Sequence, residues 1–111
     1  MLSKELVAAS TVPLVLSILR QGESYGYELI QRTHDLSDGK VQWSEGMLYP
    51  VLHWMENEGL IESEWRADSG RRRKYYRIRS EGRKALMAEK DQWTTVNSML
   101  TKLWKPLPRL T

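Results

Sequence analysis

The chain contains no cysteine and no phenylalanine, and it has no long hydrophobic run. Without cysteine it can form no disulfide scaffold, no thiol nucleophile and no cysteine-ligated zinc site, a usage compatible with a reducing cytoplasm. No apolar stretch approaches the roughly 20 residues that span a bilayer, and the charged start is unlike a secretory signal. We therefore expect a cytoplasmic protein that makes no membrane contact.

What the sequence does contain is the composition of one folded domain with an uneven charge. Of its 111 residues, 41% are hydrophobic and 28% are charged, which excludes a disordered chain. The formal net charge is only +3. Residues 66–84 nevertheless carry nine basic and two acidic side chains, so this stretch is strongly positive and the remainder is acidic. Such a concentration indicates either a contact with a polyanion or a solvated charged face.

Hydrophobic periodicity predicts two helices in the first third of the chain. The first covers residues 4–20 and is apolar on much of its circumference, which indicates contacts on two sides. Pro13 should kink this helix or begin a second piece. Gly22 should end it, and Ser24 should cap a second helix over residues 25–36. The inner side of that second helix is predicted to carry Leu29, Ile30, Thr33 and Leu36.

A short strand is predicted over residues 40–43, followed by a third helix. Ser44 is a suitable N-cap for this helix, which should end before Gly59, and Pro50 is tolerated because it falls within the first two turns. Residues 60–65 and 74–79 then alternate between apolar and polar side chains around a turn, which predicts a β-hairpin. We expect this hairpin to carry the basic run, with Tyr76 and Trp65 in its core.

Ser80 is predicted to cap a final helix that extends to about residue 104 and is stopped by Pro106 and Pro108. A weak heptad pattern runs along this helix and includes Leu86, Trp93, Val96, Leu100 and Leu103. A helix of this length in a small chain usually needs a partner. The predicted fold is therefore mainly α with a small β-hairpin: a winged helix-turn-helix over residues 1–79 and a long dimerisation helix with its tail over residues 80–111.

Several motifs resemble those of the PadR family of transcriptional regulators. They are the segments 46–61 (GMLYPVLHWMENEGLI), 70–78 (GRRRKYYRI), 25–29 (YGYEL) and 80–82 (SEG), together with Trp65. The short C-terminal part is similar to the small subgroup that includes the lactococcal multidrug-binding repressor. This resemblance implies a homodimer that represses promoters by binding inverted-repeat operators in double-stranded DNA, with each last helix packed against the first helix of the other subunit.

The resemblance also implies which residues contact DNA. Those carried over are Tyr27, Ser44, Gly46, Met47, Tyr49, His53, Arg71, Arg72, Arg73 and Lys74. Tyr49 and Pro50 have an alternative structural role, holding the start of the third helix against its neighbour. In physical terms the helix would lie in a major groove while the hairpin tip places cations against adjacent phosphates or in the minor groove.

A second implied site lies between the two subunits and would hold flat aromatic or cationic molecules between paired Trp93 indoles. The residues carried over for it are Leu6, Ala9, Val12, Pro13, Glu89, Trp93 and Asn97. Glu89 would balance a ligand's charge or, alternatively, form a salt bridge with Lys4 or Lys90. Trp93 would otherwise pack in the dimer core. For the other indoles we expect packing roles: Trp54 at the junction with the last helix, Trp43 anchoring the short strand and Trp104 against the other subunit.

The sequence gives no basis for an enzyme. His34 and His53 are not accompanied by a phosphate-binding glycine loop or a convincing acid pair, so we expect no catalysis, no metal and no cofactor. An alternative of another class is a winged-helix module for protein–protein contacts, without a DNA target or small-molecule inducer. A third hypothesis keeps DNA binding but has no inducer. The clustered arginines favour nucleic acid over a protein partner.

Overall fold

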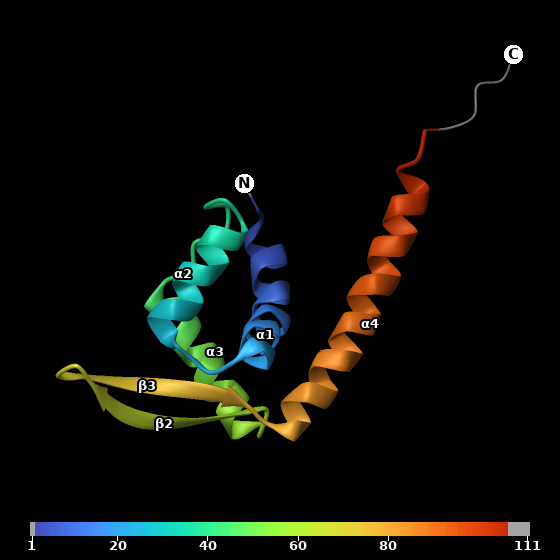
Figure 1. The fold of residues 1–111 in the computed structure, drawn as a ribbon. Helices are drawn as coiled ribbons and strands as arrows, with labels where there is room; N and C mark the ends of the chain where they lie inside the picture. The colour runs from blue at the N-terminus through green and yellow to red at the C-terminus, as the bar shows by residue number, and fades with distance from the viewer. Residues whose placement is uncertain (1, 107–111) are drawn as a thin grey trace, which may run out of the picture.

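The computed structural model describes residues 2–106, apart from the side chain of Asp68. Three helices pack together on one side of a β-hairpin, and a fourth helix leaves the root of that hairpin as a long arm (Figure 1). In chain order the elements are α1 (Lys4–Gln21), β1 (Ser24–Tyr25), α2 (Gly26–Leu36), α3 (Glu45–Asn57), β2 (Ile61–Asp68), β3 (Arg71–Ile78) and α4 (Ser80–Leu103). The predicted mainly helical winged fold with a long last helix is therefore confirmed.

The sheet contains a strand that the sequence pattern did not predict. Its order is β1-β3-β2 and both pairings are antiparallel. The strand predicted over residues 40–43 is wrong, because that segment has no strand pairing and buries Val41 and Trp43 as a loop. The free edge of β3 is occupied by β1 instead, with Ser24 opposite Tyr76.

Of the serines predicted to cap helices α2, α3 and α4, only Ser44 does so. Ser44 caps α3 as predicted, but Ser24 does not cap α2, because it belongs to β1 and its hydroxyl donates to the Glu28 carboxylate at 2.6 Å. Ser80 is likewise the first residue of α4, not its cap, since Arg79 occupies the cap position without a side-chain hydrogen bond. Helix α1 continues through Pro13 without a break, so the two-piece alternative is wrong.

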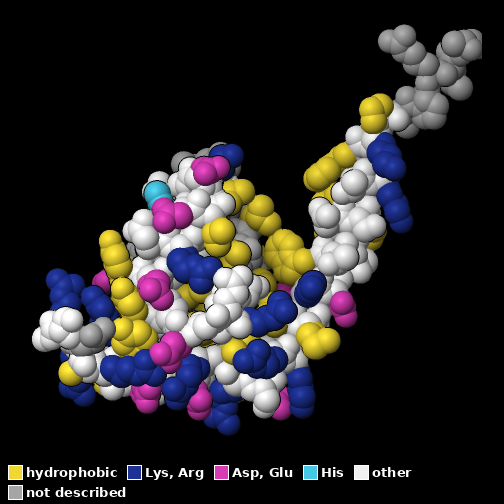
Figure 2. All heavy atoms as spheres, in the orientation of Figure 1, with side chains coloured by type: hydrophobic (Ala, Val, Ile, Leu, Met, Phe, Trp, Pro, Cys, Tyr) yellow, Lys and Arg dark blue, Asp and Glu magenta, His cyan; other side chains and the backbone are white. Residues whose placement is uncertain are grey.

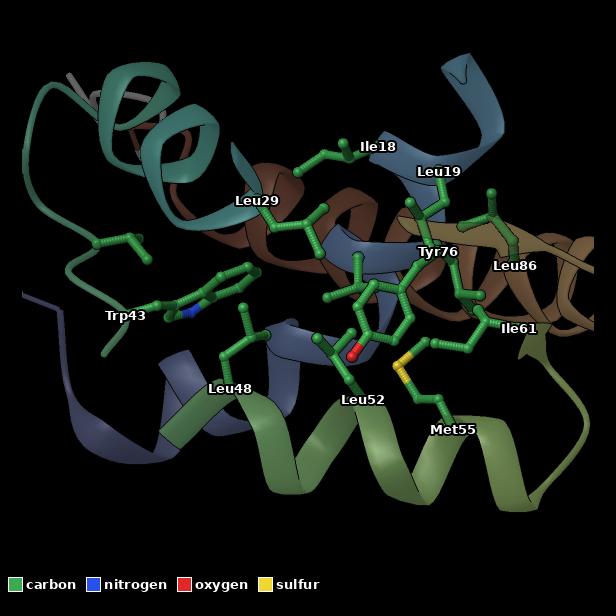
Figure 3. Close-up of a cluster of buried hydrophobic side chains, with 13 residues drawn as sticks. Ile18, Leu19, Leu29, Trp43, Leu48, Leu52, Met55, Ile61, Tyr76 and Leu86 are labelled. Atoms are coloured by element: carbon green, nitrogen blue, oxygen red, sulfur yellow. The ribbon is translucent and has the colours of Figure 1, made fainter. Parts of the chain in front are cut away.

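The core lies where α1, α2 and α3 meet the buried face of the hairpin (Figure 3). Leu29 from α2 and Leu52 from α3 are fully buried, and Tyr76 from β3 projects between them and Met55. This packing fixes α3 against the hairpin. The buried apolar residues are Val15, Leu16, Ile18, Leu19, Leu29, Val41, Trp43, Leu48, Leu52, Met55, Ile61, Tyr76 and Leu86.

Three residues predicted to be inside are outside. Leu36 is 70% exposed at the end of α2, and Trp54 is 50% exposed on α3 and does not fill the junction with α4. Trp65, on β2, is 57% exposed, and its ring lies against the Arg72 guanidinium of β3 instead of in the core. Of the two residues expected in the hairpin core, only Tyr76 lies there.

Helix α4 is anchored only at its beginning. Gly82 lies against Leu60 and Ile78, and Leu86 belongs to the core, while most residues beyond them are exposed. Its far half carries an unpartnered apolar surface that includes Val96, Met99, Leu100 and Leu103. The helix ends close to the predicted position, and Pro108 lies outside the described residues. None of the described helices is both long and apolar enough to cross a membrane.

Candidate nucleic-acid interface

The first turn of helix α3 is polar and exposed to solvent. The Ser44 hydroxyl accepts a hydrogen bond from the Met47 amide at 3.2 Å, which satisfies one of the free N–H groups of the first turn. Gly46 and His53 are exposed along the same helix. Met47 differs from the other predicted contacts, since it is half-buried and lines a separate hollow with Val12 and Val51.

A groove runs between α3, the start of α2 and the hairpin, and we call it the wing groove. It is lined by Tyr25, Gly26, Tyr27, Tyr49, His53, Glu56, Trp65, Arg71, Arg72, Arg73, Lys74 and Tyr76. Seven of the ten residues predicted to contact DNA therefore share one groove. Figure 2 shows basic side chains gathered along the hairpin beside this region. Ser44, Gly46 and Met47 are not among its lining residues.

Aromatic rings support the cations of the hairpin. The Arg72 guanidinium lies 5.1 Å from the centre of the Trp65 ring, and that of Arg73 lies 4.6 Å from the Tyr25 ring. The strand register explains the first pair, because Trp65 and Arg72 lie on the same face of the hairpin. A ring face restrains a long cationic side chain without neutralising its charge. The Trp65 ring thus orders Arg72 without removing its positive charge.

Other basic residues of the hairpin are neutralised. Arg66 forms bidentate hydrogen bonds with Glu23 at 2.5 and 2.7 Å and also pairs with Glu64. These hydrogen bonds lower the pKa of Glu23 below its ordinary value. Arg77 pairs with Glu62 at 3.5 Å and with Glu64 at 3.4 Å. The positive charge counted over residues 66–84 is therefore smaller at the surface than in the sequence.

Tyr49 has the structural role that the sequence left as an alternative. Its ring lies against the backbone of Gly26, so closely that an added Cβ at Gly26 would be 2.6 Å from the Tyr49 hydroxyl oxygen. Burial, with a further contribution from Glu45, raises the pKa of Tyr49. The tyrosine is still 41% exposed in the groove, so packing does not remove its hydroxyl from solvent.

Several residues that shape this groove are absent from the predicted DNA contacts. Tyr25 and Trp65 supply ring faces, Gly26 allows Tyr49 to approach, and Glu56 contributes a carboxylate. Alternation along β2 could have placed Trp65 beside Arg72 had the hairpin register been known. No local signal could have brought Tyr25 to the hairpin, because its pairing with Tyr75 is long-range.

The predicted small-molecule residues are only partly brought together. Leu6, Ala9, Glu89 and Trp93 border one shallow hollow between α1 and α4, and Pro13 borders an adjacent one with Trp93. Val12 faces the separate hollow beside Met47, and Asn97 lies exposed further along α4. The predicted site is therefore not assembled within one chain.

Glu89 makes neither of the contacts predicted for it within the chain. The Trp93 indole Nε1 donates a hydrogen bond to Glu89 Oε2 at 3.1 Å, and the described residues show no salt bridge from Glu89 to Lys4 or Lys90. The carboxylate is one helical turn before the indole, which makes this pairing geometrically natural. Trp93 itself is 38% exposed. Across residues 2–106, no group of three acidic or histidine side chains is placed to hold a metal ion.

An exposed helix beside a cationic β-hairpin, both built on a three-helix core, defines a winged-helix DNA-binding fold. The sequence profile of the transcriptional regulator PadR-like family matches residues 15–88. The chain belongs to this family of transcriptional regulators.

Similar proteins agree with this assignment. A transcriptional regulator from Clostridium thermocellum, Cth-833, has a TM-score of 0.85 at 28% identity, over 95% of this chain and 100% of that one. The PadR-like regulator BC4206 from Bacillus cereus has a TM-score of 0.82 at 33% identity, over 94% of this chain and 100% of that one. The transcriptional regulator Rv3488 of Mycobacterium tuberculosis is 43% identical over 58 residues, which cover 52% of this chain and 54% of that protein. All three are described as transcriptional regulators.

Proposed function

We propose that this protein is a homodimeric repressor that binds an inverted-repeat operator in double-stranded DNA and releases it when a flat aromatic ligand binds between the subunits. Residues 1–79 form the DNA-binding unit, and residues 80–111 form the dimerisation helix and tail. The observation that carries the proposal is the wing groove, where exposed residues of α3 lie beside arginines held on ring faces.

Within this unit the contacts divide by chemistry. Ser44, Gly46, Met47, Tyr49 and His53 are proposed to face the DNA groove from α3, and Tyr27 is proposed to contact a phosphate. Arg71, Arg72 and Arg73 place their cations at the hairpin tip, where they meet phosphates. Lys74 differs from these arginines because its ammonium already faces the Glu56 carboxylate at 3.2 Å.

The exposed apolar face of α4 supports the homodimer. Val96 and Leu100 are 52% and 36% exposed on α4, and a helix with such an exposed apolar face gains stability by burying it against a partner. Sedimentation at several concentrations should give a dimer mass. A monomer at micromolar concentration would contradict this part of the proposal.

The DNA proposal is tested by salt-dependent binding of a fluorescent duplex that carries an inverted repeat. Each lost phosphate contact reduces the slope of log K against log salt by about 0.9, so Arg71→Ala/Arg72→Ala should reduce it by about 3 to 4 in a dimer. The matched control is Arg20→Ala/Arg83→Ala, which removes the same charge beside a different hollow between α1 and α4. Absence of binding to any duplex at low salt would instead favour a protein–protein module.

The ligand proposal extends the resemblance to the multidrug-binding subgroup. Trp93 would stack on a planar cation, Glu89 would balance its charge, and Leu6, Ala9, Val12, Pro13 and Asn97 would complete the surroundings in the dimer. Titration with 9-aminoacridine should quench tryptophan fluorescence in the wild type and in Trp104→Ala, but not in Trp93→Ala. Equal quenching in both variants would favour a regulator without this inducer.

A further inference from the structure

Glu56 joins α3 to both strands of the hairpin. Its Oε2 accepts a hydrogen bond from the Ser63 hydroxyl of β2 at 2.8 Å, and its Oε1 lies 3.2 Å from the Lys74 ammonium of β3. The side chains of Glu56 and Lys74 are 25% and 33% exposed, so both are partly sheltered from solvent. One carboxylate at the end of α3 is therefore connected to each strand of the hairpin, which forms the wing of the fold.

Lys74 is held from a second side. Its Nζ lies 5.6 Å from the centre of the Tyr76 ring, and Tyr76 is itself buried in the core. The lysine thus has an aromatic face on one side and a carboxylate on the other. Arg71 and Arg72, three and two residues earlier, are exposed at the hairpin tip. The four consecutive basic residues are therefore not equivalent in structure.

The charge in the wing groove is not uniform either. Glu56 is the acidic residue among the side chains that line it, across the part of the chain that the structure describes. A carboxylate in a groove that receives DNA repels phosphate, and it lowers affinity unless its charge is compensated. The position of Lys74 provides that compensation, and the pair contributes almost no net charge to the groove.

We propose that Glu56 is a positioning residue that fixes the angle of the wing against α3 and withholds Lys74 from the phosphates. This inference rests on the DNA-binding function proposed above. The Ser63 and Lys74 contacts restrain the two strands together, so the tip arginines are presented at a set distance from α3. Phosphate attraction is then supplied by the tip arginines and not by Lys74.

The first test separates charge from position. Glu56→Gln keeps an oxygen acceptor for Ser63 but removes the charge that holds Lys74, so the freed ammonium can reach DNA. With a mixed-sequence 25-base-pair duplex, we expect several-fold tighter binding and a salt slope steeper by about 2 per dimer. Glu58→Gln is the matched control, because Glu58 is exposed on the same helix end and the charge change is identical. Lys74→Gln should leave the wild-type slope unchanged.

Two results of this binding experiment would overturn the inference. One is a salt slope for Glu56→Gln that equals that of Glu58→Gln. The other is a slope for Lys74→Gln that falls as far as that of Arg72→Gln, which would make Lys74 a direct phosphate contact. The double variant Glu56→Gln/Lys74→Gln should return to the wild-type slope, since the released cation is gone.

The second test needs no DNA and so distinguishes this inference from the proposed function. Hydrogen exchange of the β2 and β3 amides should become faster in Glu56→Ala, which loses both contacts, and stay at the wild-type rate in Glu58→Ala. Equal exchange in the two variants would overturn the positioning role even if DNA binding were observed. Faster exchange in Glu56→Ala alone, with no duplex bound by the wild type, would support the positioning role and contradict the regulator.

Discussion

Gly82 lies where α4 crosses the root of the wing, and Gly82→Ala changes that crossing by a single methyl group. A Cβ at this position would be 2.2 Å from the Leu60 carbonyl oxygen and 2.8 Å from Ile78 Cγ1. The nearest obstacle is backbone, which cannot rotate away as a side chain can. Helix α4 must therefore shift from β2 and β3 or remain strained.

The magnitude follows from two opposing effects. Overpacking a close contact costs about 1 to 3 kcal/mol, while alanine is favoured over glycine in a helix by up to about 1 kcal/mol. Since the clash at Gly82 involves a backbone carbonyl oxygen, the cost lies in the upper half of that range, and subtracting the helix gain leaves a net loss of about 1 to 2 kcal/mol. For a domain of this size, each kcal/mol corresponds to a melting shift of about 4 to 8 °C.

Gly46 provides a matched control for the same substitution. It also lies in the first turn of a helix, but the nearest atom to an added Cβ is the Ser44 hydroxyl oxygen at 4.0 Å. Gly46→Ala should therefore raise stability by about 0.5 to 1 kcal/mol. Urea unfolding at one fixed protein concentration compares the two variants. Equal stability of Gly82→Ala and Gly46→Ala would refute the close-approach argument.

Further predictions concern the core and the groove. Leu52→Ala should lower the free energy of unfolding in urea by about 2 to 5 kcal/mol, because Leu52 is fully buried. Leu36 is exposed, so Leu36→Ala should lower it by no more than about 0.5 kcal/mol. Burial, with contributions from Glu56 and Tyr49, raises the pKa of Tyr76 from 10.0 to about 12. Below pH 10 the folded and unfolded states both keep this proton, so stability is unaffected; between pH 10 and 12 only the unfolded state loses it, and stability falls by about 2 kcal/mol. Tyr76→Phe should lack this fall when unfolding is compared at pH 9 and 11.5, and a fall of the same size in the variant would assign it to other groups. Gly26→Ala should displace the Tyr49 ring, detectable as a lower pKa in the ultraviolet titration of that tyrosine. An unchanged titration would contradict the close packing of Tyr49 against Gly26.

The sequence predicted those features whose cause is local. Ser44 was identified as a cap because its hydroxyl reaches an amide three residues further along. Ser24 and Ser80 are also serines at predicted helix starts, but neither of them caps a helix. Pairing of Ser24 with Tyr76 draws it into the sheet, and a long-range contact of this kind leaves no mark in the surrounding residues.

The candidate site divides in the same way. Alternation along the return strand located the hairpin and its cations, because a strand's period is visible in the sequence. The ring beneath Arg73 comes from Tyr25, on the far side of α2 and α3 in the chain, and only the fold places it there. Trp65 was assigned to the core on its strand face, but its ring lies in the open wing groove against the Arg72 guanidinium.

The positive charge of the hairpin therefore has two functions that a charge count does not separate. Arg66 and Arg77 both pair with the carboxylate of Glu23, in the segment before α2, and with carboxylates of β2. They therefore tie the hairpin to the helical core from its outer face. Exposed pairs of this kind contribute little stability individually, but a network joining three segments restrains their relative position. Since a paired guanidinium releases no counterion when DNA binds, the salt slope measures only the remaining cations. Ion pairs of this kind fix the orientation of the wing before it meets DNA. We therefore expect the slope of log K against log salt to be smaller than the number of basic residues in the hairpin sequence would give.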